Sequence, residues 1–330
     1  MPRGTAAGTG ALKMLVTERR STWFRILFKY RGTAFARMRG RLAYSTLLAV
    51  AVTFVDLKFG YFHPDLTVIP FTLVGLSLSI FLGFRNNTSY DRFWEGRKLW
   101  GQLVNTSRTL TRQLLTLIAA PGGDAGTADT DAISEFRREM VYRLIAFVHC
   151  FRMHLRDQDK YEELRELLSA TELESLKPEL NKPNAIVQAM GFRLRDAWQR
   201  GWIHPMHVPI LEQSLTSLTD IQGGCERIKS TPIPFSYTSL IHQIVALYCI
   251  ALPFGIVKTV GLFTPVVVCI VAYAFYGLDA IGDEVENPFG LDPNDLPLSS
   301  LSRMIEVNLR QRLGETELPP LLKPKGGLLS

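Results

Sequence analysis

The chain has 330 residues, of which 47% are hydrophobic and 21% are charged, and its formal net charge is +6. This length fits one large domain or two small ones. The four cysteines form no CxxC pair and no metal-ligand spacing, which argues against a disulfide framework and against a zinc module.

The positive charge is concentrated at the N-terminus. Residues 1–41 hold ten Lys or Arg residues and a single acid, Glu18. The segment runs directly into an apolar block, and a basic flank beside a membrane span is typical of the cytoplasmic side. We therefore expect it to face a membrane and not a nucleic acid. No secretory signal is expected, because the first apolar run begins only after about 40 residues.

Four apolar stretches are long enough to cross a bilayer as helices. They cover residues 42–62, 66–84, 237–257 and 262–278. The flanking segments are richer in Lys and Arg than the two short turns, so we expect both termini and the middle of the chain in the cytoplasm. The predicted division is a basic N-terminal segment 1–41, spans in 42–84, a helical cytosolic region 85–235, spans in 236–282 and a cytosolic C-terminal segment 283–330.

The second stretch carries two neighbouring stripes at helical spacing. The bulky stripe consists of Leu76, Ile80 and Phe84. The adjoining stripe of small residues consists of Gly75, Ser79 and Gly83. Small residues at this spacing let membrane helices approach closely. In a ring of identical helices the bulky stripe would then line a dry central constriction that gates by excluding water.

Polar residues flank this constriction. Arg85, Asn86 and Asn87 are predicted to form a collar at its inner end, and Asp65 is predicted at the outer mouth. Asp56, near the end of the first stretch, lies two residues from the nearest lysine. Residues at this spacing do not share a helix face, so the sequence leaves two alternatives for Asp56: it faces the vestibule or pairs with a residue other than Lys58.

The middle region has helical periodicity almost throughout. Helices are predicted over 94–118, 133–156, 160–180, 185–200 and 208–221, with a surface loop at 121–131. Almost nothing indicates a strand, and the tail after Leu313 is expected to be mobile. The predicted fold class is therefore all-α.

Several ionisable residues lie close to the apolar stretches or to prolines. The acids that follow the fourth stretch are Asp279, Asp283, Glu284 and Glu286. We expect them to pair with arginines such as Arg92 and Arg97, or with the basic N-terminal segment. His204 and His207 flank a proline, where zinc binding is conceivable but packing within the turn is favoured.

No pattern typical of an enzyme is present, because the sequence lacks HExxH, GxSxG and a Gly-rich phosphate loop. A secondary transporter would usually show internal repeats or broken helices, which argues against that class. Two functions therefore remain for a protein with four membrane spans: an ion channel or a non-conducting membrane scaffold.

Three separated segments resemble the bestrophin family, and its bacterial branch most of all. They are IPFTLVGLSLSIFLGFRNNTSYDRFWEGRKLWGQLVNTSR at 69–108, PFSYTSLIHQIVALYCIALPFGIV at 234–257 and AYAFYGLDAIGDEVENPFG at 272–290. The resemblance implies a homopentameric ion channel of helical subunits in the bacterial inner membrane, with a pore neck formed by Leu76, Ile80 and Phe84. It also implies a second, cytosolic aperture, which matches Val208 before Pro209.

Eukaryotic members of the family carry a calcium-binding acidic run directly after the motif NPFG. At that position this chain has LDPNDLP, whose two acids, Asp292 and Asp295, are too few for a calcium clasp. No metal and no cofactor is therefore expected. The bacterial branch includes cation-conducting members, which favours monovalent cations such as sodium. A chloride channel of the same architecture is the alternative.

Overall fold

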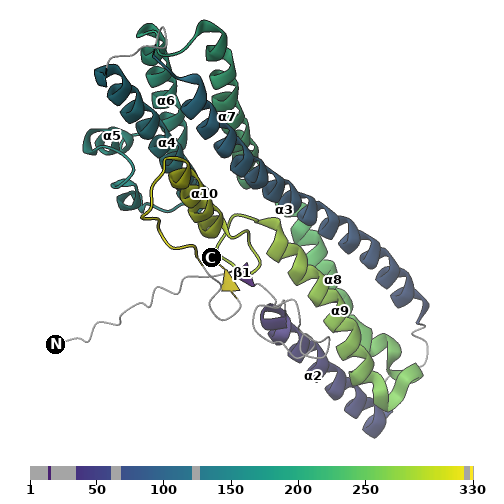
Figure 1. Ribbon diagram of the computed structural model, residues 1–330. Helices are drawn as coiled ribbons and strands as arrows, with labels where there is room; N and C mark the ends of the chain where they lie inside the picture. Colours follow the sequence, from purple (N-terminus) through teal and green to yellow (C-terminus); the bar gives the residue numbers. More distant parts are fainter. Residues whose placement is uncertain (1–13, 16–34, 61–67, 121–126, 323–327, 330) are drawn as a thin grey trace, which may run out of the picture. The chain divides into compact units, whose positions relative to one another are not determined.

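The computed structural model describes residues 14–15, 35–60, 68–120, 127–322 and 328–329 (Figure 1). The fold is all-α, as predicted. Its strands in these ranges are one short antiparallel pair, β1 (Met14–Leu15) with β2 (Leu328–Leu329). The chain divides into two compact units. Unit 1 comprises Met1–Val16, Glu95–Ser230 and Phe289–Ser330, and unit 2 comprises Thr17–Trp94 and Thr231–Pro288.

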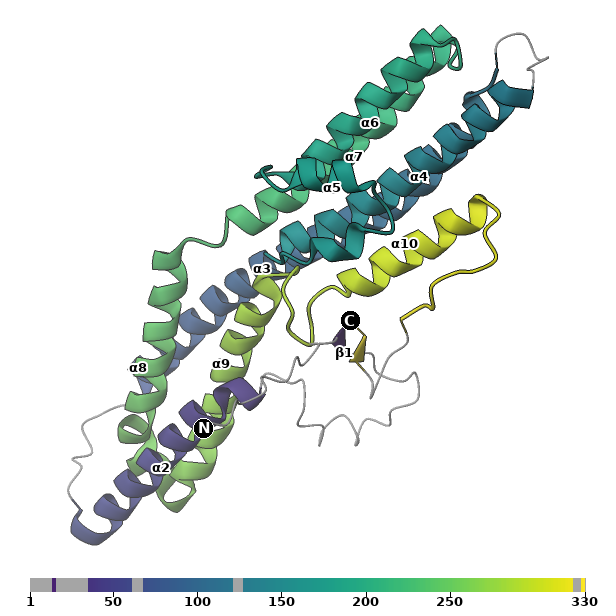
Figure 2. The ribbon, with the colours of Figure 1, turned by 90° about the vertical axis from the view of Figure 1, so that its left-hand side faces the viewer.

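Unit 2 is a bundle of apolar helices (Figure 2). Its helices are α2 (Phe35–Phe59), the first part of α3 (Ile69–Leu117), α8 (Phe235–Val260) and α9 (Thr264–Glu286). Each helix contributes to a core that includes Met38, Leu82, Val245 and Phe275. In the described part of the chain, three helical segments are long and apolar enough to cross a membrane. They are α2, α3 and the stretch Phe235–Glu286, which contains both α8 and α9.

A tight turn joins α8 to α9 through the 3-10 helix η3 (Gly261–Phe263). Gly261 ends α8 with a φ of 59°, a left-handed conformation that favours glycine. The Thr264 hydroxyl donates to the Gly261 carbonyl oxygen at 2.7 Å and closes the turn. Just before the turn, Lys258 Nζ lies 2.7 Å from Asp56 Oδ1. Asp56 therefore pairs with a residue outside its own helix.

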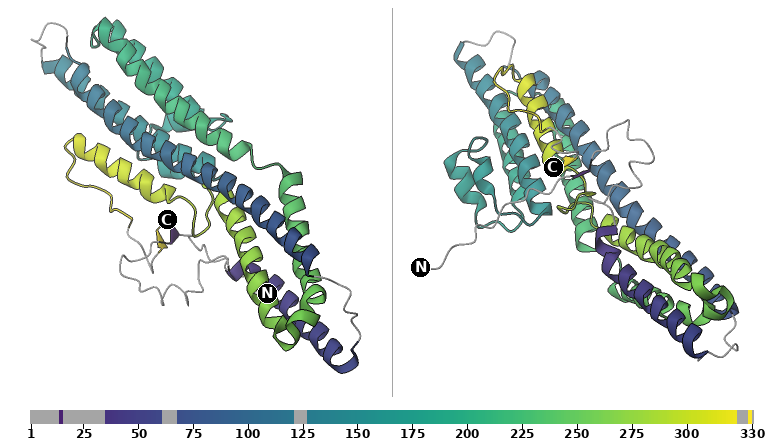
Figure 3. Two further views of the ribbon diagram at one scale, coloured as in Figure 1. Left: turned by 90° about the vertical axis from the view of Figure 1, so that its right-hand side faces the viewer. Right: turned by 90° about the horizontal axis from the view of Figure 1, so that it is seen from below.

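Unit 1 is a second helical bundle, shown from further sides in Figure 3. Beside the rest of α3 it contains α4 (Thr127–Leu155), η1 (Tyr161–Leu164), α5 (Ala170–Leu176), α6 (Lys182–Gln199), η2 (Pro205–His207), α7 (Val208–Ser230) and α10 (Leu298–Arg312). Helix α4 packs against α6 and α10, and α6 packs against α7. The core is aromatic, with the rings of Trp100 and Phe151 stacked at 5.7 Å between centroids.

Two predicted boundaries are wrong for local reasons. The predicted loop 121–131 overlaps α4, which begins at Thr127, because its Thr and Asp residues are of the types that favour the start of a helix. The single helix predicted over 160–180 is instead η1 followed by α5. Ser169 caps α5 in a capping box with Glu172 and so begins a new helix.

Other helices are longer than predicted. The predicted stretch 66–84 and the predicted helix 94–118 are joined in the structure by one continuous helix, α3, which runs from Ile69 to Leu117, because no proline interrupts the chain between them. Helix α7 continues past its paired glycines to Ser230. There Gly224 makes room for Leu99, whose Cδ1 would lie 3.0 Å from an added Cβ. The C-terminal segment also holds α10, which the sequence did not predict.

The close approach of α8 to α3 gives a packing test within unit 2. A Cβ added to Gly255 on α8 would lie 2.1 Å from the Phe71 ring on α3. We expect Gly255→Ala to lower the apparent melting temperature of the detergent-solubilised protein, because overpacking costs about 1–3 kcal/mol. Gly191→Ala on α6 is the control. Nothing lies within 4 Å of its added Cβ, so its helix propensity should raise stability slightly. Equal melting temperatures for the two variants would contradict the close approach.

Candidate functional site

One face of α3 in unit 2 is apolar and exposed within the described part of the chain. Leu76, Ile80 and Phe84 are 62%, 51% and 60% exposed. The opposite face carries Leu78 and Leu82, which are buried in the core at 2% and 0% exposure. A bulky apolar row is unfavourable in water, so this face requires lipid, another copy of the chain or a dry pore beside it.

The small residues next to this face do not share one environment. Gly75 is buried, and an added Cβ would lie 2.7 Å from the Tyr248 hydroxyl of α8. The Ser79 hydroxyl donates to the Gly75 carbonyl oxygen at 2.8 Å. Nothing lies within 4 Å of a Cβ built on Gly83. Of the three, only Gly75 therefore serves close helix packing inside the chain.

Behind the exposed face lies a cluster of charges, the Arg85 cluster, formed by Arg41, Arg85, His242, Asp279 and Asp283. The Arg85 side chain is 0% exposed and donates to Asp279 Oδ1 at 2.7 Å and to Asp283. Arg41 donates to the other carboxylate oxygen of Asp279 at 3.2 Å. His242 Nε2 lies 3.4 Å from Asp279 Oδ1 and 3.3 Å from Asp283 Oδ1. All four helices of unit 2 contribute to this cluster.

Burial makes the pair of Arg85 with Asp279 mandatory, because an unpaired charge in a low-dielectric interior costs several kcal/mol. The two guanidinium groups balance the two carboxylates when His242 is neutral. His242, Asp279 and Asp283 also bring three possible metal-ligand atoms within 4.8 Å of one another. Both carboxylates already bind Arg85, which supplies the positive charge that a metal ion would otherwise bring.

Arg85 is placed differently from the predicted collar. Asn87 is exposed and Asn86 is half-buried, but Arg85 lies inside the chain. Each residue advances about 100° around a helix, so Arg85 continues the buried row of Leu82 and leaves the exposed row of Phe84. The helical spacing of Arg85 from Leu78 and Leu82 could have indicated from the sequence that Arg85 is buried.

The predicted partners of the acidic residues are confirmed only in part. Asp279 does bind the basic N-terminal segment, through Arg41, but its buried partner is Arg85 and not Arg92 or Arg97. Arg92 instead donates to the backbone carbonyl oxygen of Glu286 at 3.0 Å. Asp65, the predicted outer-mouth residue, lies outside the described residues.

Val208 is the first residue of α7 in unit 1, where it is half-buried and lines a cavity of about 230 Å³ with Trp198 and Leu211. The preceding turn η2 brings the rings of His204 and His207 to 5.6 Å between centroids. His204 Nδ1 accepts a hydrogen bond from the Met206 N–H at 3.3 Å. The described contacts of these histidines are therefore those of a packed turn.

An arginine holds the loop that follows the motif NPFG. Arg156 donates to the carbonyl oxygens of Phe289 at 3.3 Å and Leu296 at 3.2 Å. Burial lowers the pKa of Arg156 to about 10, which leaves it charged at neutral pH. The Asp292 N–H donates to Asp295 Oδ2 at 2.7 Å within the same loop. The guanidinium group of Arg156 thus binds the backbone carbonyl oxygens of this loop.

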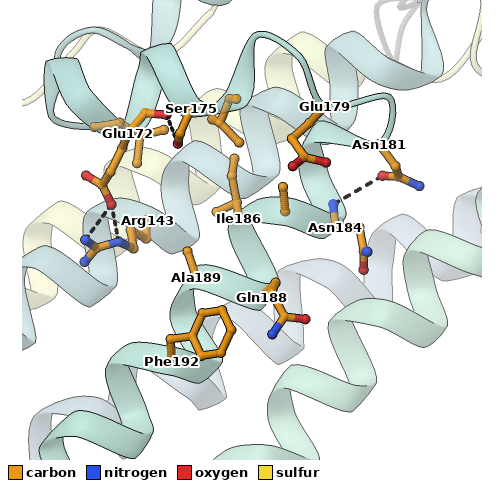
Figure 4. A pocket seen from close by; sticks show the side chains of 13 residues that line it. Arg143, Glu172, Ser175, Glu179, Asn181, Asn184, Ile186, Gln188, Ala189 and Phe192 are labelled. Atoms are coloured by element: carbon orange, nitrogen blue, oxygen red, sulfur yellow. Dashed lines mark hydrogen bonds and ion pairs between the residues drawn. The ribbon is translucent and has the colours of Figure 1, made fainter.

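A separate pocket of about 330 Å³ lies beside α5 and α6 in unit 1 (Figure 4). On one side, Arg143 Nε of α4 donates to Glu172 Oε1 at 2.7 Å. On the other side, the N–H of Asn184 donates to Asn181 Oδ1 at 3.2 Å, which caps α6. Ile186 lines the apolar part of the pocket. The Arg143–Glu172 bond fixes α5 to α4 and the Asn184–Asn181 bond caps α6, so these polar groups serve packing and capping.

Comparison with known proteins decides the family. The family model of the Bacterial/Fungal Bestrophin protein matches residues 14–311. The chain belongs to the bestrophin family. This bestrophin is 40% identical over 296 residues to a voltage-dependent anion channel-forming protein of Ralstonia nicotianae, covering 90% of this chain and 94% of the relative. It is 35% identical over 310 residues to the voltage-dependent anion channel-forming protein YneE of Escherichia coli K12, covering 94% and 98%.

The fold of this bestrophin also matches a solved structure. A bacterial Bestrophin homolog from Klebsiella pneumoniae is 32% identical, with a TM-score of 0.78 over 85% of this chain and 100% of that chain. The resemblance found in three sequence segments is confirmed. The bestrophins are a channel family and the named relatives are channel-forming proteins, so the chain is a bacterial membrane protein of a channel family and not an enzyme.

The Arg85 cluster generates a stability test. Asp279→Asn removes the carboxylate that binds the buried guanidinium, and Asp283 compensates only in part. We expect a loss of about 3 kcal/mol, at the lower end of the cost of breaking a buried ion pair. The measurement is the apparent melting temperature of the purified protein in detergent. Asp220→Asn, at an exposed position on α7, should leave it unchanged. An equally stable Asp279→Asn variant would show that the cluster does not hold the bundle.

Proposed function

We propose that this bestrophin is an oligomeric ion channel whose narrowest part is a hydrophobic neck formed by Leu76, Ile80 and Phe84. The single observation that carries the proposal is the exposed apolar row on α3, which has no covering partner within the described chain. A row of this kind, repeated around a common axis, gives three stacked apolar rings. Such rings exclude water and ions until they widen.

The number of copies follows from the family resemblance, which implies a homopentamer. Each copy contributes one side chain to every ring, so neighbouring copies meet through two different flanks of α3 and the ring closes on itself. On one flank, Ser79 and Gly83 keep the surface open. This open flank supports close approach of an adjacent copy in the membrane.

The membrane topology belongs to the same proposal. We assign four spans to α2, the first part of α3, α8 and α9, in the bacterial inner membrane. The basic segment 1–41, the region 85–235 and the segment 283–330 are then cytosolic, with both termini inside. The turn between α8 and α9 and residue Asp65 face the opposite side. The aperture at Val208 is retained as a second constriction in the cytosolic region.

The channel could select for cations or for anions. The sequence favoured monovalent cations such as sodium, with chloride as the alternative. Relatives at 35–40% identity are named as anion channel-forming proteins, which favours the alternative. We therefore propose that the channel conducts small anions such as chloride. Apolar rings do not select a sign by themselves, so the selectivity has to arise from charges elsewhere along the pore.

Truncation of the middle ring tests the neck. We expect Ile80→Ala to increase the current of the protein reconstituted in planar bilayers severalfold, because a wider and less bulky ring admits water more easily. The matched control is Leu47→Ala on α2, an apolar residue that is 69% exposed but lies outside the proposed rings. Its current should equal that of the unmodified protein.

The same recordings distinguish an ion channel from a non-conducting membrane scaffold. A non-conducting scaffold would give no current from any variant. A current that Ile80→Ala leaves unchanged, or that Leu47→Ala raises equally, would remove Ile80 from the gate. A melting curve of each variant establishes that the compared proteins are folded.

A further inference from the structure

The half of α3 that belongs to unit 1 has an unusual charge composition. From Gly96 to Leu117 the sequence contains four basic residues and no acidic residue. All four basic residues are exposed, among them Lys98, Arg108 and Arg112. We call these three residues the basic row. The polar face of this part of α3 is therefore positively charged.

The basic row occupies one face of the helix. In a helix of 3.6 residues per turn, Lys98, Arg108 and Arg112 fall within an arc of about 80°. The opposite side is buried, since Trp100, Leu103 and Leu110 are all 0% exposed. Asn105, which lies inside the same arc, is also exposed. The burial pattern therefore directs all three positive charges away from the core of unit 1.

The register of this face matches that of the apolar row. Helix α3 is one continuous helix from Ile69 to Leu117. Lys98 follows Ile80 by 18 positions, which corresponds to five turns of an ideal helix. By residue spacing, the basic row therefore follows Ile80 at whole or nearly whole turns of the helix.

The basic row is also electrostatically uncompensated. In the part of the chain that the structure describes, Lys98, Arg108 and Arg112 form no ion pair. Glu95, the acid that precedes the segment, is bound by Arg227 Nη2 at 2.6 Å. The acids nearest in the chain therefore do not neutralise the row, and its charge is available to mobile ions.

We infer that the basic row lines the pore beyond the neck and gives the channel its preference for small anions. This inference rests on the proposed function, because it requires copies of α3 around a common axis. Each copy would add three positive charges to the wall of the pore. Rings of Arg and Lys side chains concentrate anions and repel cations within a Debye length, which is about 10 Å at 0.1 M salt.

The test replaces all three side chains with neutral ones of similar length, Lys98→Gln, Arg108→Gln and Arg112→Gln. The reversal potential of the reconstituted protein is measured under a sodium chloride gradient. We expect the chloride-to-sodium permeability ratio to fall by about threefold or more. The difference from the unmodified protein should shrink near 1 M salt, where the Debye length is only about 3 Å.

The control is Arg312→Gln, which removes an exposed positive charge at the end of α10, away from the basic row. Its permeability ratio should equal that of the unmodified protein. The single variants Arg108→Gln and Arg112→Gln should each give a smaller decrease, and they replace the triple variant if the triple variant does not fold.

The outcomes separate this inference from the channel proposal. An unmodified protein that carries no current would refute both the channel and the role of the basic row. A channel whose permeability ratio is the same in the basic-row variants would refute the basic row alone and leave the neck intact. An equal decrease for Arg312→Gln would also refute it, because the effect would then reflect net charge and not position.

Discussion

The buried ion pair between Arg85 and Asp279 is the interaction on which the rest of unit 2 depends. A guanidinium with no access to water must face a carboxylate, and Asp279 provides one from a helix that is distant in sequence. This requirement fixes the rotation of α3 about its own axis. Arg85 lies about 180° from Leu76 and about 140° from Ile80 on a helical wheel. Once Arg85 is buried, these apolar side chains must face outward.

The rotation of α3 links stability to the proposed function. The same helix places an ion-paired charge inside the bundle and an exposed apolar row outside it. A bundle without the Arg85 cluster could bury Leu76 and Ile80 in its own core and would then have no face to offer a pore. The buried charges therefore help to keep the apolar row of α3 outside a core that is otherwise apolar.

In the proposed channel, two different physical effects are separated along α3. Apolar side chains control whether water enters, and that effect is independent of the sign of the ion. Positive side chains further along the helix act on sign through long-range Coulomb interaction, which salt screens. A single long helix can carry both effects, since α3 runs without a break from Ile69 to Leu117.

The sequence by itself determined the all-α class, the apolar stretches and the family, because hydropathy, helical period and motif order are local properties of the chain. It also selected Leu76, Ile80 and Phe84 as members of one row. Only the tertiary structure decided that this row faces outward and that Arg85 faces inward. Periodicity defines which residues share a face, but the direction of that face depends on partners such as Asp279, 194 positions away. The split of 160–180 into η1 and α5 likewise depended on the cap formed by Ser169, because both alternatives satisfy the same helical pattern.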